Sequence, residues 1–338
     1  MRPCFTGTLL AGLMALAPLP AAAQVTLKMA TLVPENSSWF RILKEMGESW
    51  NKLSAGRVKV ILYPGGRQGD EPDVVRKMRL GSLQGALLTS QGLAEIDRSV
   101  YALGIPLGYA SAEEMYATLE KMRPGLEAGF ETKGFTVVNW ADGGWVRFFS
   151  RKPIASPEDL RRQKLFTWAG DPKSLEIWKG AGFNAIPAPA TELATGLQTG
   201  LLDAFITSPQ VVLVTRYYEQ APHMTDLKWG LILAGTVLTR DAWNRVPADL
   251  RPALLKAAQE SGAKFRADMR AAEARDLQAL QQAGLKVVAV DARNQALWRQ
   301  LVDSLHNKIR GEFVPAPAYD EAMKFRDDYR RQAGTARK

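Results

Sequence analysis

The residue whose setting most favours binding chemistry is Arg147, within the apolar run Trp145-Val146-Arg147-Phe148-Phe149. Side chains alternate between the two faces of a strand, so a strand here places Trp145, Arg147 and Phe149 on one face. A guanidinium between two large aromatic side chains is poorly solvated and needs an anionic partner. That partner is either a bound solute or an internal acidic side chain, and the sequence leaves both alternatives open.

Further candidate ligand-binding residues lie at or just after the ends of predicted strands. In α/β domains, ligands bind at the carboxyl ends of the strands. The residues in such positions are Asn36, Trp39, Gln91, Trp168 and Asp171. Three of them have a structural alternative, because Trp39 can pack in the core, and Asn36 and Asp171 can cap the helices that follow them.

Residues for catalysis or metal binding are sparse. The two histidines, His223 and His306, lie far apart in the sequence, and no G-x-S-x-G motif occurs. Carboxylates together with a bound solute can still hold a hard cation. We therefore predict a binding protein rather than an enzyme, with no cofactor and no metal of its own.

The N-terminus has the pattern of an export signal. Arg2 is followed by the apolar stretch Leu9 to Leu16 and then by Ala21-Ala22-Ala23, an A-x-A cleavage site. The predicted signal peptide spans residues 1–23 and carries the only cysteine, Cys4. Beyond it, no apolar run reaches the length that spans a bilayer. We expect a protein that is exported to the periplasm and is soluble there after cleavage.

The charges are mixed rather than gathered. The formal net charge is +9, but lysines and arginines alternate with acidic residues along the chain. Nucleic-acid-binding proteins usually concentrate positive charge on one stripe. We therefore expect no nucleic-acid partner, and a mildly basic surface is compatible with anionic solutes.

The elements that must position these residues have an α/β pattern. A strand over 25–33, a helix over 39–53 and a strand over 58–62 alternate, which favours a largely parallel sheet. A second α/β unit follows, with strands predicted at 135–140, 146–150, 164–168, 183–186 and 201–206. From Ala248 to Ala283 the pattern predicts one helix of ~54 Å, longer than a small domain is wide, which would brace both units.

Several short segments, in this order and spacing, resemble the solute receptors of TRAP (tripartite ATP-independent periplasmic) transporters, the DctP family. They are Val58 to Tyr63 before Gly69, Leu80-Gly81, Arg147-Phe148-Phe149-Ser150, Ile154 to Leu160, Glu192 with Leu197-Gln198-Thr199-Gly200 and Asp203, and Ala242-Trp243 with Pro247. The similarity covers nearly all of the sequence after the signal peptide.

The resemblance implies a two-lobe fold of the periplasmic-binding-protein type, with a cleft between the lobes and hinge closure on a solute. It places lobe I at 24–146, with 233–265 returning to it, and lobe II at 147–232, with 266–310 contributing. Residues 311–338 would form a C-terminal helix packed across the lobes. The partners implied are a small organic acid and the small and large membrane subunits of the transporter, with monomer or dimer left open.

The resemblance also implies a site. Receptors of this family usually grip a carboxylate with an arginine on the strand after the P-x-D-L helix, and Phe166 stands at that position. Where the family usually has an asparagine before a proline, this chain has Thr207-Ser208-Pro209. It is therefore similar to a subgroup that lacks the gripping arginine.

Two hypotheses for the solute follow from this departure. The solute is a monocarboxylate held by Arg147 with help from Thr207, Ser208 or Asn36, or it is a larger apolar or aromatic molecule stacked on Trp145 or Trp168. An acid with an apolar or aromatic body satisfies both. Rival functions are a receptor for an ATP-driven importer, a ligand-sensing partner of a membrane kinase, and an exported enzyme.

Overall fold

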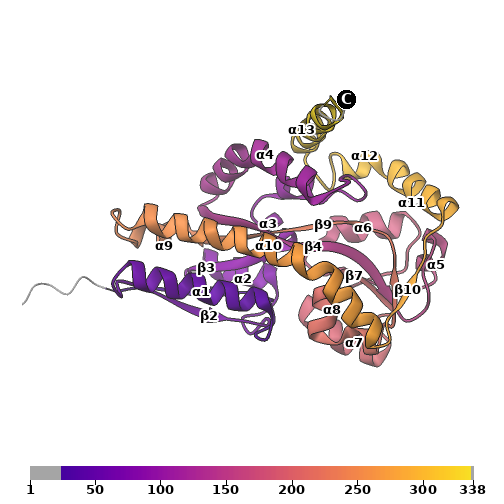
Figure 1. Cartoon of the computed structure of the whole chain (residues 1–338), viewed down its shortest axis with the longest axis horizontal. Helices are drawn as coiled ribbons and strands as arrows, with labels where there is room; N and C mark the ends of the chain where they lie inside the picture. Colours follow the sequence, from indigo (N-terminus) through magenta and orange to yellow (C-terminus); the bar gives the residue numbers. More distant parts are fainter. Residues whose placement is uncertain (1–23, 336–338) are drawn as a thin grey trace, which may run out of the picture.

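The computed structural model describes residues 24–335, so the predicted signal peptide at 1–23 lies outside the described residues. Figure 1 shows two α/β bodies side by side, with one long helix, α10, running across both. We call the body that contains β1 to β3 the first lobe and the body that contains β5 to β8 the second lobe. No helix of residues 24–335 is long and apolar enough to cross a bilayer.

The first lobe is built on three parallel strands with helices between them. The elements are β1 (Val25–Ala30), α1 (Ser38–Leu53), β2 (Val58–Tyr63), α2 (Glu71–Arg79), β3 (Gly85–Thr89), α3 (Ser90–Ala94), η1 (Arg98–Leu103) and α4 (Ala112–Thr132). Helix α1 begins where the Ser37 side chain accepts a hydrogen bond from the Phe40 amide. Its apolar residues repeat at helical spacing and bury one face, including Trp39 and Trp50.

The second lobe repeats this alternation with shorter elements. They are α5 (Pro157–Arg161), β5 (Leu165–Trp168), α6 (Pro172–Gly180), β6 (Ala185–Ala188), η2 (Ala190–Glu192), α7 (Leu193–Thr199), β7 (Ala204–Thr207), α8 (Pro209–Thr215), η3 (Tyr217–Glu219), β8 (His223–Thr225) and β10 (Lys286–Val288). Ser156 and Asp159 form a capping box at the start of α5, as the sequence Ser156-Pro157-Glu158-Asp159 indicates.

Two long antiparallel strands, β4 (Phe135–Ser150) and β9 (Gly230–Thr239), join the lobes. The strand order β2-β1-β3-β9-β4-β7-β5-β6 is therefore mixed, and the expectation of a largely parallel sheet is wrong at its centre. The strands predicted at 135–140 and 146–150 are one strand, whose pairing with β9 shifts register between Asp142 and Trp145. Gly144 adopts a φ of +81° at that bulge, an angle that glycine reaches without a side-chain clash.

Helix α10 (Arg251–Gln282) confirms the prediction of a long bracing helix. Its 32 residues extend ~48 Å, and it contacts α1 in the first lobe, α8 in the second lobe and β4 between them. Gly262 permits the close approach to β4, because a Cβ atom there would lie 2.6 Å from the Trp140 carbonyl oxygen.

The C-terminal segment covers one side of both lobes. It consists of α11 (Ala292–Ser304), α12 (His306–Ile309) and α13 (Ala316–Thr335). The remaining helix, α9 (Arg240–Arg245), lies between β9 and α10. Helix α13 packs on α4 and η1, whereas Trp298 of α11 belongs to the core of the second lobe. The residue boundaries given above for the two lobes stay predictions.

Candidate functional site

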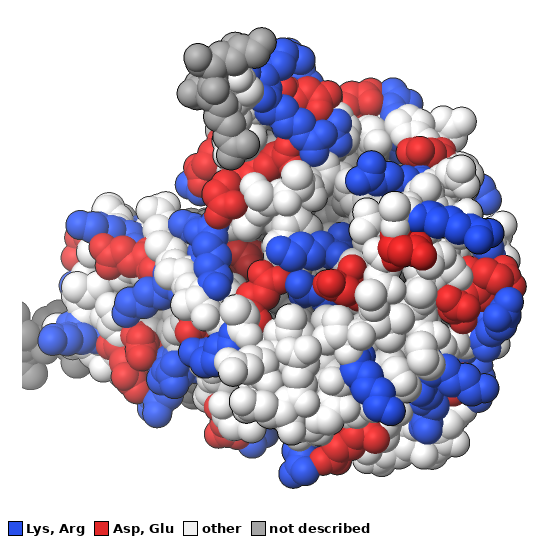
Figure 2. Space-filling view, turned by 45° about the vertical axis from the view of Figure 1, so that its right-hand side comes forward, with Lys and Arg blue, Asp and Glu red and all other residues white. Residues whose placement is uncertain are grey.

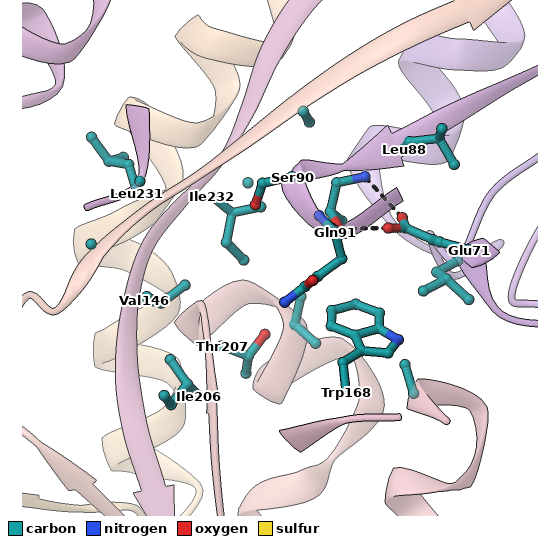
Figure 3. A pocket seen from close by; sticks show the side chains of 18 of the residues that line it. Glu71, Leu88, Ser90, Gln91, Val146, Trp168, Ile206, Thr207, Leu231 and Ile232 are labelled. Atoms are coloured by element: carbon teal, nitrogen blue, oxygen red, sulfur yellow. Dashed lines mark hydrogen bonds between the residues drawn. The ribbon is translucent and has the colours of Figure 1, made fainter. Parts of the chain in front are cut away.

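A cavity of about 640 Å³ lies between the lobes. The first lobe lines it with the ends of β1 and β3, and the second lobe with the ends of β5 and β7. The joining strands contribute Val146 from β4 and Leu231 and Ile232 from β9, and Figure 3 shows these side chains on one side of the open space. The carboxyl ends of parallel strands thus meet at the cavity, as this fold class predicts.

The uncharged polar side chains that line the cavity include Gln91, Thr167 and Thr207, and we call these three the polar band. The Gln91 side chain points into the open space, with Trp168 and Thr207 of the second lobe facing it (Figure 3). Its Oε1 atom accepts a hydrogen bond from the Tyr101 hydroxyl, which leaves its amide N–H groups for a solute. The Thr167 hydroxyl is buried and has no partner within residues 24–335. The polar band therefore offers neutral hydrogen-bonding groups.

The charged groups that line the cavity are carboxyls. Among the described residues that line it, none is lysine or arginine, whereas Glu71 and Asp142 are present. Burial raises the pKa of Glu71 to about 7, although its carboxyl accepts hydrogen bonds from the Thr89 amide and hydroxyl and from the Gly92 amide. Burial also raises the pKa of Asp142, which accepts a 2.5 Å bond from the Tyr116 hydroxyl. An anionic solute finds no opposite charge in this wall.

Two aspartates join the lobes beside the cavity. Asp70 of the first lobe accepts hydrogen bonds from the Trp168 indole nitrogen at 2.6 Å and from the Ala190 amide at 2.8 Å. Asp171 of the second lobe pairs with Arg98 at 3.2 Å and lies 3.1 Å from the Tyr101 hydroxyl, whose single hydrogen is shared between Asp171 and Gln91. Charge-assisted bonds of this kind are about twice as strong as neutral ones, so they favour the closed arrangement of the lobes.

Arg147 lies on the opposite side of β4 from the cavity. Val146 lines the cavity, while the Arg147 guanidinium pairs with Glu273 of α10 at 2.7 Å. The Arg147 side chain is 5% exposed, and its Nε and Nη1 atoms have no partner within the described chain. The alternation predicted for this strand holds, but α10 covers the face that carries Arg147. The structure thus supplies the internal acid that was the alternative partner, and a solute contact for Arg147 stays a prediction.

A second, smaller pocket of about 230 Å³ lies on that side, and we call it the hinge pocket. Its charged lining residues are Glu113, Asp142, Lys228, Arg270, Glu273 and Asp276. Lys228 lies 3.7 Å from Glu273 and over the Trp145 ring, so the charges are mutually paired. Figure 2 shows the same mixing of positive and negative side chains over one face of the molecule.

The structure divides the predicted site residues into groups. Trp39, Gln91, Phe166, Trp168 and Thr207 line the cavity, and Trp145 and Ser208 line the hinge pocket. The Asp171 carboxyl caps α6, and Asn36 is exposed, with Ser37 capping α1 in its place. Neither Asn36 nor Asp171 belongs to the cavity wall, because both precede helices whose first turns take up their polar groups or turn them outward.

Several cavity residues were not predicted. They include Ile177 and Trp178 of α6, Trp229 before β9, and Val302, Leu305 and Ile309 of the C-terminal segment. The sequence carries no pattern that brings these three segments together, because their meeting depends on how α11 and α12 return to the second lobe. The abundance of tryptophan was the only available signal.

A cavity enclosed by two α/β lobes, with two strands and a long helix crossing between them, defines a two-lobe solute-binding protein. The chain matches the sequence profile of the family "Bacterial extracellular solute-binding protein, family 7" (DctP) over residues 29–312. It therefore belongs to this family. Family membership confirms the prediction of an exported binding protein that is not an enzyme, and the fold prediction is confirmed with it.

Individual relatives are distant in sequence and close in structure. The 2,3-diketo-L-gulonate-binding periplasmic protein YiaO of Escherichia coli is 25% identical over 307 residues, 90% of this chain and 92% of that protein. A TRAP periplasmic solute-binding protein of Ralstonia eutropha with bound (S)-2-acetolactate has a TM-score of 0.84 at 18% identity, covering 90% of this chain and 99% of that one. One from Xanthobacter autotrophicus with bound β-D-galacturonate has a TM-score of 0.79 at 22% identity, covering 89% and 99%.

Proposed function

We infer that this chain is the solute receptor of a TRAP-type secondary transporter and that it binds an organic acid with an apolar or aromatic body. The observation that carries this proposal is the cavity wall, which is mainly aliphatic and aromatic and has no lysine or arginine among its described residues. The relatives named above bind small acids that are rich in oxygen. Support for an acid comes from that kinship, and support for an apolar body comes from this wall.

Phe166 is the residue that separates this chain from the family pattern described above. Its side chain lines the cavity, and its ring lies 6.2 Å from the Trp168 ring, tilted by 56°. Without a guanidinium at this position, a carboxylate loses about 1.5–3 kcal/mol of charge-assisted hydrogen bonding. The two rings offer apolar contact instead, at roughly 25 cal/mol for each Å² of apolar surface removed from water. Affinity then depends more on the body of the solute than on its charge.

The carboxylate itself is received by neutral donors in this proposal. The buried Thr167 hydroxyl and the Gln91 amide are the available groups of the polar band. Neutral hydrogen bonds contribute about 0.5–1.5 kcal/mol each, less than charged ones. Recruiting Arg147 instead would require the ion pair with Glu273 to break and would leave that carboxylate without its 2.7 Å partner.

Delivery follows from closure of the lobes around the solute. The bonds of Asp70 and Asp171 join the lobes in the closed form, and the small and large membrane subunits of the transporter would receive the solute when the lobes open. Either a monomer or a dimer is compatible with this role.

A panel of acids matched in charge tests the proposal. Phenylacetate, hexanoate and galacturonate differ in body, and phenylacetamide is the uncharged control for phenylacetate. A ligand that binds only the folded state raises the melting temperature, with about 2.7 kcal/mol of stabilisation at a hundred times Kd. We expect the largest shift with phenylacetate and none with phenylacetamide. A shift with galacturonate alone contradicts the apolar body, and a shift with phenylacetamide equal to that with phenylacetate contradicts an acid.

A further inference from the structure

One part of the cavity wall is distinct from the polar band. It consists of Ile177 and Trp178 of α6, Trp229 before β9, and Val302, Leu305 and Ile309 of α11, the α11–α12 junction and α12. We call this part the aromatic chamber. Ser174, one turn before Trp178, is the polar side chain that α6 adds beside it.

The aromatic chamber is the open end of the hydrophobic core of the second lobe. That core surrounds Phe148 and Trp298, both fully buried, with their rings stacked at 5.0 Å. Trp178, Val302 and Leu305 pack on it while lining the cavity. Part of the apolar surface of this core therefore faces the cavity between the lobes, where an apolar molecule can cover it.

The two indoles of the aromatic chamber are held in place from behind. The Trp178 ring lies 5.9 Å from the Trp229 ring and meets the Phe183 ring edge-on at 4.9 Å. The Trp229 ring in turn meets Trp298 at 5.6 Å. Such contacts fix the rings before any solute arrives, so little side-chain entropy is lost when they form a binding surface.

The part of the aromatic chamber that α12 contributes is fixed in the same way. Ile309 is buried, and Phe313, which follows it, stacks on Tyr101 of the first lobe at 4.3 Å. The Arg98 guanidinium lies over both of these rings and pairs with Asp171 of the second lobe. The wall is therefore complete only when the lobes are closed.

The position of Thr167 connects the aromatic chamber to the polar band. Thr167 alternates with Phe166 along β5 and is buried on the side of Leu165, a residue of the same core as Trp298. Its unpartnered hydroxyl thus lies on the aromatic-chamber side of the sheet. An acid group at Thr167 directs the rest of its molecule towards Trp178 and Trp229.

We propose that the aromatic chamber is the subsite for the body of the solute, and that the solute is an arylalkanoic acid, with a ring separated from its carboxylate by a short methylene chain. This inference rests on the proposed function and specifies its substrate class. The carboxylate lies at the polar band, and the ring lies against the surface that Trp178 and Trp229 form together. Each methylene that moves the ring deeper adds about fourfold in affinity until the chamber is filled.

A homologous series tests this. Phenylacetate, 3-phenylpropionate and 4-phenylbutyrate are titrated by calorimetry into the wild-type chain, Trp178→Ala, Val302→Phe and Trp243→Ala. Trp243 contacts Trp50, far from this wall, and is the control for removing an indole. We expect affinity to rise along the series in wild type and Trp243→Ala. In Trp178→Ala, the total increase in affinity from phenylacetate to 4-phenylbutyrate should be about tenfold smaller than in wild type. In Val302→Phe, 4-phenylbutyrate should lose more affinity than the two shorter acids, because the added ring shortens the chamber.

The outcomes separate the two proposals. Equal affinity across the series, or an unchanged series in both Trp178→Ala and Val302→Phe, overturns the aromatic chamber while leaving an acid receptor intact. If none of the three acids binds but a uronate such as galacturonate does, both the arylalkanoic class and the apolar body fail. If Trp178→Ala does not fold, Val302→Phe alone decides, since loss of the longest acid with retention of phenylacetate supports the chamber and no difference overturns it.

Discussion

The two sides of strand β4 at the hinge differ in charge. On one side, Val146 faces a cavity whose wall has no lysine or arginine among the described residues. On the other side, Arg147 faces α10, and the hinge pocket there contains Lys228, Arg270 and Glu273. One residue of displacement along a strand reverses the face, so neighbouring positions serve two different environments.

We propose from this difference that charge in the hinge serves the scaffold, whereas the cavity recognises the shape of its solute. An ion pair between β4 and α10 fixes where the strand crosses from one lobe to the other. A cavity without a cation gives little discrimination between anions by charge, so its selectivity must come from apolar contacts and a few hydrogen bonds. The following changes test this division.

The largest effect is expected at Glu273. Glu273→Ala leaves the Arg147 guanidinium buried without a carboxylate, and loss of one partner of a buried pair costs about 3–5 kcal/mol. Because the Glu273 side chain is 29% exposed, solvent reduces that cost. We expect the free energy of unfolding to fall by roughly 2–3 kcal/mol, measured by chemical denaturation.

The paired replacement Arg147→Met with Glu273→Leu is the control. It removes both charges together, so no buried charge is left unpaired and most of the stability should return. The double variant should bind phenylacetate within about threefold of wild type, because neither residue lines the cavity. A folded double variant that no longer binds phenylacetate would make Arg147 a solute contact and end the division between the two sides.

Closure of the cavity comes next in size. Asp70→Asn keeps the helix cap on α2, where Oδ1 accepts from the Glu71 amide, but it replaces Oδ2 with an NH2 group that cannot accept the bonds from Trp168 and Ala190. A closed state that is less populated binds more weakly in proportion, so we expect about a tenfold loss in affinity for phenylacetate. Calorimetry measures it. Asp73→Asn, on the exposed side of the same helix, should change nothing, and equal affinities in the two variants would contradict a role for Asp70 in closure.

Much of the fold can be predicted from the sequence. Helical spacing of apolar residues indicates α1, and the run after Pro252, in which Gly262 is the one helix-breaking residue before the helix ends at Gln282, indicates α10. The central pair is harder, because β9 has no alternating pattern and is buried along most of its length. Gly143-Gly144 also separates two apparent strands that are in fact continuous. Strand pairing across the hinge is a tertiary effect that local patterns do not record.

The site is predicted less completely, for a physical reason. Alternation correctly groups Trp145 with Arg147, but which face meets the cavity depends on the position of α10, about 120 residues later. Strand ends indicate Gln91, Trp168 and Thr207, and these three residues line the cavity. Trp229 and Ile309 reach the cavity only because the C-terminal segment returns to the second lobe, which no local pattern indicates.

A smaller effect is expected at Thr167, where one substitution should raise stability and lower affinity. Thr167→Val keeps the shape and removes a buried hydroxyl that has no partner. The unliganded chain should become slightly more stable, because an unsatisfied buried polar group costs about 1–3 kcal/mol. Affinity for phenylacetate should fall by roughly fivefold, the value of one neutral hydrogen bond. Denaturation and calorimetry measure the two quantities, and a variant that binds as well as wild type would exclude Thr167 as a carboxylate donor.

The smallest effect concerns pH and the charge that the cavity itself carries. Burial raises the pKa of Glu71 to about 7, with Asp70 as an additional negative neighbour. As the pH falls from 8 to 6, Glu71 takes up a proton and an anionic solute meets one negative charge fewer. Affinity for phenylacetate should therefore rise by roughly two- to fivefold over this range, whereas binding independent of the charge of Glu71 would stay flat. Glu71→Gln cannot titrate and should remove the dependence of affinity on pH. The variant should also be less stable, because its amide group faces the Thr89 N–H. If the affinity for phenylacetate still depends on pH in Glu71→Gln, a group other than Glu71 titrates on the cavity side of β4.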